Sequence, residues 1–349
     1  MLTKEQINEI REHLDKAQNP IFYYDNDADG LCSFALLRRY IERGKGVAVR
    51  SFPELNESYA RKAIELGSDY VFVLDKPVMS KEFAEAIDKL GLPLVWIDHH
   101  DLPEEKFEKE LKNFFVYNPA RNKDEKSDEP VTYWSYKISN KKEDVWIAVM
   151  GCIADHYLPD FIDEFTGKYV EYWGNVKKPF DAYYGTEIGK AAMMLNFGLK
   201  DSISNVIRLQ NFLINAKGPE SFFEESKENY FLRKKYNDVK KKYDTLVDKA
   251  EASVKGKLIF FDYSGELSIS SDVSNEISYK YPDKYIVVAY KKGEISNISV
   301  RGKGVKKILE RVLERVGGRG GGHDDAVGAR IETKDLEKFR ECFEEAIAE

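Results

Sequence analysis

The chain has 349 residues, more than one small hydrophobic core needs, so the length predicts two domains. Its formal net charge of -7 argues against a polycation that coats nucleic acid, although a local basic groove remains compatible with it. The three cysteines are scattered without a CxxC pair, the N-terminus lacks a signal-peptide pattern, and no apolar run reaches the ~18 residues that cross a bilayer. Together these features predict a cytoplasmic protein without a membrane segment.

Short apolar runs alternate with helix-period segments between residues 20 and 159. The apolar runs are "PIFYY" (20–24), "GVAVRSF" (46–52), "DYVFVLD" (69–75) and "LPLVWID" (92–98). Continuous apolarity is typical of strands that are covered on both faces, and strand–helix repetition of this kind predicts a parallel sheet. A mainly helical stretch from about 145 to 213 follows.

A heptad pattern marks the next segment and predicts one long charged helix. Its apolar positions follow 4-3-4-3-4 spacing: Leu232, Tyr236, Val239, Tyr243, Leu246 and Ala250. We expect a connector helix over 226–256; a coiled-coil dimer is the alternative. The strand–helix pattern then restarts at Lys257. The predicted division is therefore an α/β domain with a helical extension (1–225), the connector (226–256) and a smaller α/β domain (257–349).

Acidic residues and histidines gather where the apolar runs of the first domain stop. They are Asp25, Asp27 and Asp29 after the first run, Asp75 after the third, and Asp98, His99 and His100 after the fourth. Because ligands bind at the carboxyl ends of parallel strands, we expect these residues at one edge of the sheet. Asp155, which follows an apolar helix, joins them if that helix returns to the same edge.

Carboxylates together with imidazoles suit Mn²⁺, Fe²⁺, Zn²⁺ or Co²⁺. The number of candidate ligands favours two ions, which can activate a bridging hydroxide and bind a phosphate oxygen. Taken singly, each motif has a simpler explanation: "DNDADG" is compatible with a calcium loop or a solvated turn, and Asp75 with a helix N-cap. Their succession on consecutive strands favours the metal site.

A glycine cluster in the second domain is a candidate phosphate-binding element. Gly320, Gly321 and Gly322 precede His323, and their backbone N–H groups can approach a phosphate without side-chain obstruction. Arg301 offers a planar fork suited to phosphate. A flexible turn is the alternative. Basic residues are frequent between 301 and 319, which indicates either a nucleic-acid surface or an ordinary solvated helix face.

These motifs resemble, in order, those of the DHH phosphoesterase superfamily in its DHH plus DHHA1 branch. The matching segments are "DNDADG" (25–30), "VLD" (73–75), "DHH" (98–100), "GCIAD" (151–155), "SVRG" (299–302) and "GGRGGGHDDAVGARI" (317–331). The first motif is more similar to the RecJ single-strand exonuclease group than to the nanoRNase group. The resemblance implies a DHH domain and a DHHA1 domain with the active site in the cleft between them.

The resemblance also implies roles for individual residues. Two Mn²⁺ ions, with Mg²⁺ or Co²⁺ as substitutes, are expected on Asp27, Asp29, Asp75, His99 and Asp155, with Asp75 bridging. Asp98 is expected to orient His99 through a hydrogen bond, and His100 to lie near the nucleophilic water or the phosphate. The phosphate-binding set is Arg301, Gly320, Gly321, Gly322 and His323.

Three departures from the family pattern stand out. Tyr23 occupies a position that often holds a histidine, so the first metal site either lacks a ligand or recruits Asp25. Lys76 and Pro77 follow Asp75 in place of the more usual small residues. "GGGHDD" sets two acids beside the expected phosphate site.

The function that the resemblance implies is that of a Mn²⁺-dependent exonuclease that hydrolyses terminal phosphodiester bonds of single-stranded DNA or RNA. The alternative is a phosphodiesterase or phosphatase of short oligonucleotides, cyclic dinucleotides or 3′-phosphoadenosine nucleotides. A third possibility is a catalytically silent partner of replication or repair proteins. Polarity, the choice of DNA or RNA, and the oligomeric state stay open.

Overall fold

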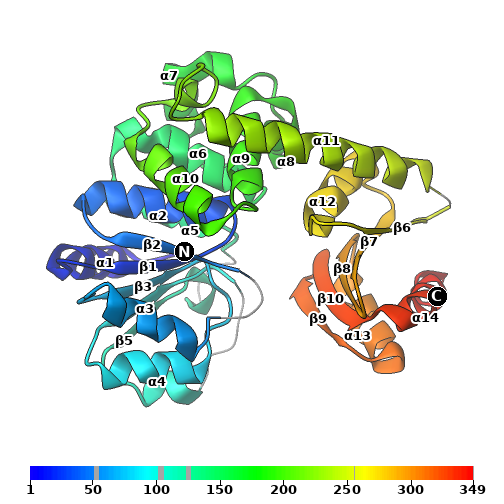
Figure 1. Ribbon diagram of the computed structural model, residues 1–349, viewed down its shortest axis with the longest axis horizontal. Helices are drawn as coiled ribbons and strands as arrows, with labels where there is room; N and C mark the ends of the chain where they lie inside the picture. Colours follow the sequence, from blue (N-terminus) through cyan, green and yellow to red (C-terminus); the bar gives the residue numbers. More distant parts are fainter. Residues whose placement is uncertain (51–54, 101–105, 123–126, 255, 349) are drawn as a thin grey trace. The chain divides into compact units, whose positions relative to one another are not determined.

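A computed structural model describes residues 1–50, 55–100, 106–122, 127–254 and 256–348. The chain forms two compact units, Met1–Tyr236 and Asn237–Glu349. Figure 1 shows the elements of both. Each unit contains its own five-stranded sheet, and each is described by itself.

The sheet of the first unit is parallel throughout, with strand order β2-β1-β3-β4-β5. Its strands are β1 (Ile21–Asp25), β2 (Lys45–Val49), β3 (Val71–Leu74), β4 (Leu94–Ile97) and β5 (Phe114–Tyr117). The parallel sheet predicted from the apolar runs is thus confirmed. The strand β5 was not predicted, and residues 51 and 52 of the second predicted strand lie outside the described residues.

Helices cover both faces of this sheet, which explains the continuous apolarity of its strands (Figure 1). The helices α3 (Ala60–Glu65) and α4 (Lys81–Lys89) pack on one face, in a core that includes Tyr23, Val73 and Trp96. On the other face α2 (Ala28–Ile41) places Phe34 against Phe22 and Tyr24, at ring distances of 5.5 and 5.2 Å.

The remaining helices of the first unit are α1 (Lys4–Lys16), α5 (Val131–Ser139), α6 (Val145–Ala154), α7 (Ile162–Tyr169), α8 (Pro179–Gly185), α9 (Glu187–Gly198) and α10 (Ile203–Asn215). Of these, α1, α5, α6, α9 and α10 contact α2, and α7 and α8 pack on α6. The helices α6 to α10 confirm the mainly helical stretch predicted from about 145 to 213. Of the helices that the structure describes, none has the length and apolarity needed to cross a membrane.

The heptad positions lie on α11 (Tyr230–Ala252), and most of them are buried within the chain. Leu232 lies close to Gly198, and the Tyr236 ring lies 5.9 Å from that of Phe197. Farther along, the Tyr243 hydroxyl donates a hydrogen bond to Glu276. Packing within the chain therefore accounts for the heptad pattern without a second copy.

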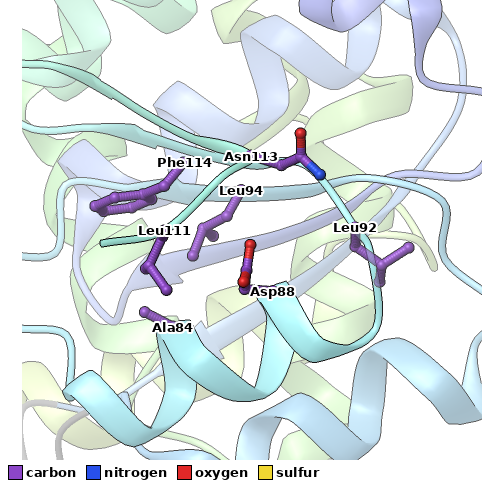
Figure 2. A pocket seen from close by; sticks show the side chains of 7 residues that line it. All are labelled: Ala84, Asp88, Leu92, Leu94, Leu111, Asn113 and Phe114. Carbon is purple, nitrogen blue, oxygen red and sulfur yellow. The ribbon is translucent and has the colours of Figure 1, made fainter. Parts of the chain in front are cut away.

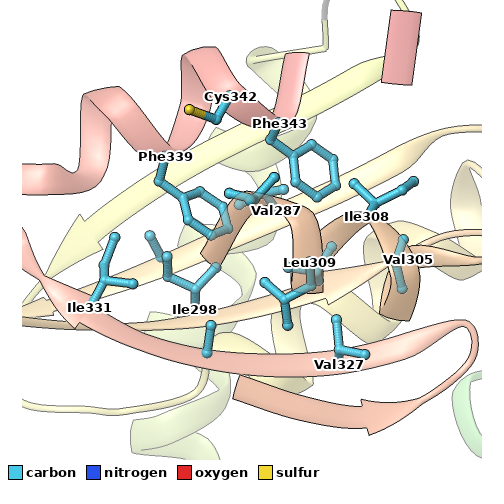
Figure 3. Close-up of a cluster of buried hydrophobic side chains, with 14 of the residues drawn as sticks. Val287, Ile298, Val305, Ile308, Leu309, Val327, Ile331, Phe339, Cys342 and Phe343 are labelled. Atoms are coloured by element: carbon cyan, nitrogen blue, oxygen red, sulfur yellow. The ribbon is translucent and has the colours of Figure 1, made fainter. Parts of the chain in front are cut away.

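The sheet of the second unit is mixed and has strand order β6-β7-β8-β10-β9. Its strands are β6 (Leu258–Ser264), β7 (Tyr285–Lys292), β8 (Ile295–Arg301), β9 (Arg319–His323) and β10 (Ala326–Glu332). Only the β6–β7 pair is parallel among these strands. The helices α13 (Val305–Val316) and α14 (Leu336–Ala348) cover one face around the core of Figure 3, and α12 (Ser270–Lys280) packs on the other face at β7 and β8.

The glycine cluster is part of the edge strand β9. Gly320 and Gly322 face β10 so closely that an added Cβ would lie 2.7 Å from the Gly328 carbonyl oxygen and 2.5 Å from that of Ala326, respectively. Glycine is therefore needed at both positions for the close approach of two backbones, and the simple flexible turn considered above is excluded.

Candidate functional site

Three neighbouring strands of the first unit end at the candidate site. The register pairs Tyr24 with Leu74 and Leu74 with Ile97, so the next residues along the chain, Asp25, Asp75 and Asp98, follow side by side at the carboxyl edge. This is the arrangement predicted from strand–helix repetition, and it sets carboxylates of β1, β3 and β4 at one place.

Two groups of side chains at this edge can each hold a cation. Asp75, His99 and His100 form one, and Asp29, His99 and Asp155 form the other; in each group the ligand atoms lie within 4.8 Å of one another. His99 Nε2 lies 3.4 Å from Asp75 Oδ1 and 3.7 Å from Asp155 Oδ2. This mixture of carboxylates and imidazoles fits Mn²⁺ and similar transition-metal ions.

The carboxylates at this edge repel one another, which is visible in their pKa values. Burial, with the charges of Asp25 and Asp29, raises the pKa of Asp27 to about 8. Burial and the charges of Asp29 and Asp27 raise the pKa of Asp75 well above its usual range. The Asp155 side chain is 41% exposed, and desolvation by the surrounding protein raises its pKa to about 6, against the opposing effect of His99. A bound cation would relieve this repulsion, so the electrostatics also fit a metal site.

Backbone geometry supports the same assignment at Asp75. Its φ of 53° lies in the left-handed region, which is uncommon for a residue other than glycine. Strained backbone of this kind persists where the surrounding structure enforces it and is frequent at functional sites. Here the Asp75 N–H donates to the Ile97 carbonyl at 3.0 Å and so holds the side chain at the site.

Asp27 and Asp29 are both tied to helix N-termini. The Asp27 carboxylate caps α2 by accepting the Gly30 N–H at 2.9 Å. The Asp29 carboxylate accepts the N–H groups of Val131 and Thr132 at 3.0 and 2.7 Å, and so caps α5, whose own N-cap Pro130 supplies no side-chain acceptor. This contact between distant parts of the sequence was not predicted. The sequence feature that pointed to this contact was a helix whose N-cap position is a proline and therefore supplies no polar side chain of its own.

The hydrogen bonds of Asp98 correct one expectation. Among the described residues, the Asp98 carboxylate accepts the backbone N–H of His100 at 2.8 Å and contacts His100 Nδ1 at 3.2 Å, so it orients His100 and not His99. Burial disfavours a charged His100, but the hydrogen bond and charge of Asp98 outweigh this effect and raise the pKa of His100 to about 9. The Asn118 side chain also donates to the His100 carbonyl, at 2.9 Å.

Asp25 has a cationic partner within the chain. Lys76 Nζ lies 2.9 Å from Asp25 Oδ1, and the lysine side chain is only 4% exposed. The Trp96 indole N–H donates to the Lys76 carbonyl at 2.9 Å and fixes this turn. The sequence signal for this ion pair was a lysine directly after a buried strand, which had stood out only as a departure from the family pattern. Asp25 belongs to neither of the two groups that can hold a cation.

Tyr23 contributes nothing to this site because its side chain enters the core. Its hydroxyl donates to the Tyr59 carbonyl at 2.7 Å, and its ring meets those of Tyr59 and Phe83 edge-on. The position that often carries a histidine in the family is therefore filled here by a packing residue.

A shallow depression near α4 is a poor alternative site (Figure 2). Its lining is Ala84, Asp88, Leu92, Leu94, Leu111, Asn113 and Phe114. Leu94 and Phe114 begin β4 and β5, so the depression lies at the amino ends of these strands, opposite the acidic edge. One carboxylate in a mainly apolar surround offers no metal site.

The expected phosphate-binding residues of the second unit lie in register across three strands. Ala326 of β10 pairs with Arg301 of β8 on one side and with His323 of β9 on the other. Arg301 Nε donates to Asn275 Oδ1 of α12 at 2.6 Å, which restrains the guanidinium. The carboxylate of Asp325 accepts the Gly304 N–H at 2.7 Å, so one of the two acids after His323 anchors the loop before α13.

Comparison with known proteins agrees with this architecture. The model of the DHH family N-terminal domain matches residues 21–160, and that of the DHHA1 domain matches residues 255–349. No curated protein matches the chain significantly.

Among solved structures, RecJ of Thermus thermophilus in complex with Mn²⁺ is similar, with 15% identity and a TM-score of 0.67 over 99% of this chain and 54% of that one. This chain thus spans about half the length of the Thermus protein. A structure of exonuclease RecJ bound to manganese is 15% identical, with a TM-score of 0.64 over 100% and 95% of the two chains. CDC45 from Entamoeba histolytica is 11% identical, with a TM-score of 0.53 over 99% and 98%.

The fold of this chain is thus similar to that of RecJ. The chain belongs to the DHH/DHHA1 superfamily, as its motifs indicated.

Proposed function

We propose that this protein is a metal-dependent phosphodiesterase that removes terminal nucleotides from single-stranded DNA or RNA. The observation that carries the proposal is that the carboxylates of Asp29, Asp75 and Asp155 gather around His99 at the carboxyl edge of the parallel sheet, close enough to hold cations. The manganese in the two similar RecJ structures supports Mn²⁺ as the ion.

Asp27, Asp29, Asp75, His99 and Asp155 would hold the metal. Two bound ions would supply Lewis acidity toward a phosphate oxygen and lower the pKa of a water nucleophile. The donors are held in place by backbone contacts of their own: Asp29 by the N-terminus of α5, and Asp75 by its bond to the Ile97 carbonyl. Contacts of this kind orient the ligand side chains, as the residues around a metal site usually do.

His100 has a separate part in the proposed reaction. In the metal-free protein the hydrogen bond and charge of Asp98 raise the pKa of His100 to about 9, which favours a protonated imidazole as long as His100 is not itself a metal ligand. A protonated imidazole can donate a hydrogen bond to a phosphate oxygen and stabilise the negative charge that develops there. Asp98 acts through His100 and is a positioning residue.

The C-terminal unit would bind substrate phosphate through Arg301, the backbone of Gly320, Gly321 and Gly322, and His323. Two observations support this role: Arg301 and His323 lie in one cross-strand row, and the Arg301 guanidinium is restrained by Asn275. A guanidinium fork suits phosphate oxygens.

The test is digestion of end-labelled single-stranded DNA and RNA of graded length with Mn²⁺, followed by separation of the products. We expect mononucleotides from long strands, and loss of this activity in Asp75→Asn, because asparagine tolerates the left-handed backbone but lacks the charge. Asp88→Asn, at the other end of the sheet, is the matched control and should keep full activity.

Two outcomes would replace the proposal. Cleavage confined to dinucleotide-sized or cyclic substrates would indicate a small-substrate phosphodiesterase. Tight Mn²⁺ binding without cleavage of any of these substrates would indicate a catalytically silent protein that acts through partners.

A further inference from the structure

The acidic edge of the first unit carries a buried positive charge of its own, on Lys76. This lysine follows Asp75 at the end of β3, and its side chain is only 4% exposed. Its ammonium nitrogen lies 2.9 Å from Asp25 Oδ1 and 3.5 Å from the carbonyl oxygen of Arg50. Carboxylate and carbonyl oxygens are also the donors that suit divalent ions such as Mn²⁺. The ammonium is thus held by the kind of oxygen atoms that hold a metal ion.

The backbone around Lys76 fixes the position of this charge. The Trp96 indole N–H donates to the Lys76 carbonyl at 2.9 Å. Pro77 follows, and a residue before a proline is disfavoured from the helical conformation. Because β1 and β3 are neighbours in register, the turn after β3 sets the lysine beside Asp25, which ends β1. The ion pair is therefore part of the architecture of this edge.

The ligands for a divalent ion lie around a different residue, His99. Its Nε2 atom lies 3.4 Å from Asp75 Oδ1 and 3.7 Å from Asp155 Oδ2, and Asp29 belongs to the same surroundings. One imidazole nitrogen binds one ion, so the side chains around His99 Nε2 form a single centre. Among the described residues, Asp25 is in neither of the groups that can hold a cation.

A second divalent ion beside Asp75 would need ligands from the β1 side of the edge. Tyr23 supplies none, because its hydroxyl donates to the Tyr59 carbonyl in the core. The Asp25 carboxylate is paired with Lys76, so it can bind an ion only after the ammonium has moved away. Positive charges at such short range also repel one another strongly where little water screens them. The structure thus disfavours an ion at this position.

We propose that the Lys76 ammonium takes the place of a divalent ion at Asp25, so that the site binds one Mn²⁺ tightly at His99 and a second only at much higher concentration. The ammonium compensates the charge of Asp25 but offers no coordination position to water or to a phosphate oxygen. The inference rests on the proposed function, which it refines by making the two ions unequal. One ion binds to a prepared set of ligands, and the other has to displace a lysine.

The test counts Mn²⁺ ions and requires no turnover. Titration calorimetry of the full chain at pH 8, together with the electron paramagnetic resonance signal of free Mn²⁺, gives the number of ions and the affinity of each. For the wild type we expect one tight ion and a second that binds at least about tenfold more weakly. Lys76→Met should bring the two affinities together, and with two equivalents of Mn²⁺ it should show the broadened spectrum of a spin-coupled pair.

Two further variants serve as controls. Asp25→Asn in the Lys76→Met background should return the protein to one tight ion, because the carboxylate that the second ion would use is lost. Lys81→Met removes a lysine that pairs with Glu85 and Glu110 on the surface, and it should leave both affinities unchanged. Circular dichroism checks that each variant is folded. The count in the wild type requires no substitution, so it tests the inference even if Lys76→Met does not fold.

Each outcome separates the inference from the function on which it rests. Two ions of equal affinity in the wild type, or an unchanged second affinity in folded Lys76→Met, would overturn the inference. If the ion counts follow the expected pattern but the wild type cleaves no single strand with Mn²⁺, the role of Lys76 stands and the exonuclease proposal fails. If the wild type cleaves long strands and binds two ions equally well, the exonuclease stands and the role of Lys76 is refuted.

Discussion

The buried ion pair between Lys76 and Asp25 gives the sharpest prediction about the acidic edge. Lys76→Met removes the charge and keeps most of the side-chain volume. Two unit charges about 4 Å apart interact by about 4 kcal/mol at an effective dielectric constant of 20, and removal of one partner from a buried pair costs about 3–5 kcal/mol. The Asp25 side chain is 20% exposed, which places the expected loss at the lower end, about 3 kcal/mol.

The loss should depend on metal in a defined direction. Without Lys76, the positive charge that compensates Asp25 beside Asp27 and its neighbours is lost. Mn²⁺ should therefore stabilise Lys76→Met more than it stabilises the wild type, since a ligand that binds only the folded state adds stability in proportion to the logarithm of its concentration over its dissociation constant.

The assay is urea unfolding of metal-free and Mn²⁺-loaded protein at pH 8. Lys81→Met is the control, because Lys81 forms only exposed pairs with Glu85 and Glu110 and should change stability by less than about 1 kcal/mol. Lys76→Met in an Asp25→Asn background should cost far less than in the wild type. A Lys76→Met loss no greater than that of Lys81→Met, or one undiminished by Asp25→Asn, would refute the reasoning.

Three further predictions concern protonation and backbone packing. Asp98→Asn should destabilise the metal-free protein most below pH 6.5. The pKa of His100 is about 9 in the folded protein and lies above its unfolded value, so its protonation contributes up to about 3 kcal/mol to the free energy of unfolding at low pH, and this contribution is lost as the pH rises through 9. Unfolding curves of the variant and the wild type at pH 6 and pH 10 measure this trend. The affinity for Mn²⁺ should rise from pH 6 to pH 8, and binding should release protons, because the Asp27 carboxyl, of pKa about 8, must ionise to bind the ion. Titration calorimetry in buffers of different ionisation heat measures both effects, and an affinity that does not change with pH would contradict the prediction. Gly320→Ala should lower stability by about 1–3 kcal/mol, because its Cβ would lie 2.7 Å from a carbonyl oxygen, whereas Gly321→Ala should leave the melting temperature unchanged.

The sequence by itself determined the parallel sheet and the edge at which its acids meet. Strands covered on both faces must be apolar throughout, and helical crossovers leave every strand pointing the same way. Asp25, Asp75 and Asp98 were therefore predictable as neighbours from position alone. The short strand β5 was missed because its four residues follow no clear strand–helix repeat.

Which charged and polar groups bind one another was determined only by the tertiary structure. Asp98 bonds to His100, Lys76 neutralises Asp25, and Asp29 caps a helix that begins far along the chain, at Val131. Gly320 and Gly322, for which a flexible turn was the alternative, lie in an edge strand where the partner backbone leaves no room for a side chain. Hydrophobic periodicity is a local property of the chain and can be recognised in the sequence alone. Ion pairs, caps and strand contacts join distant segments over a few ångströms, so they are settled only when the chain has packed.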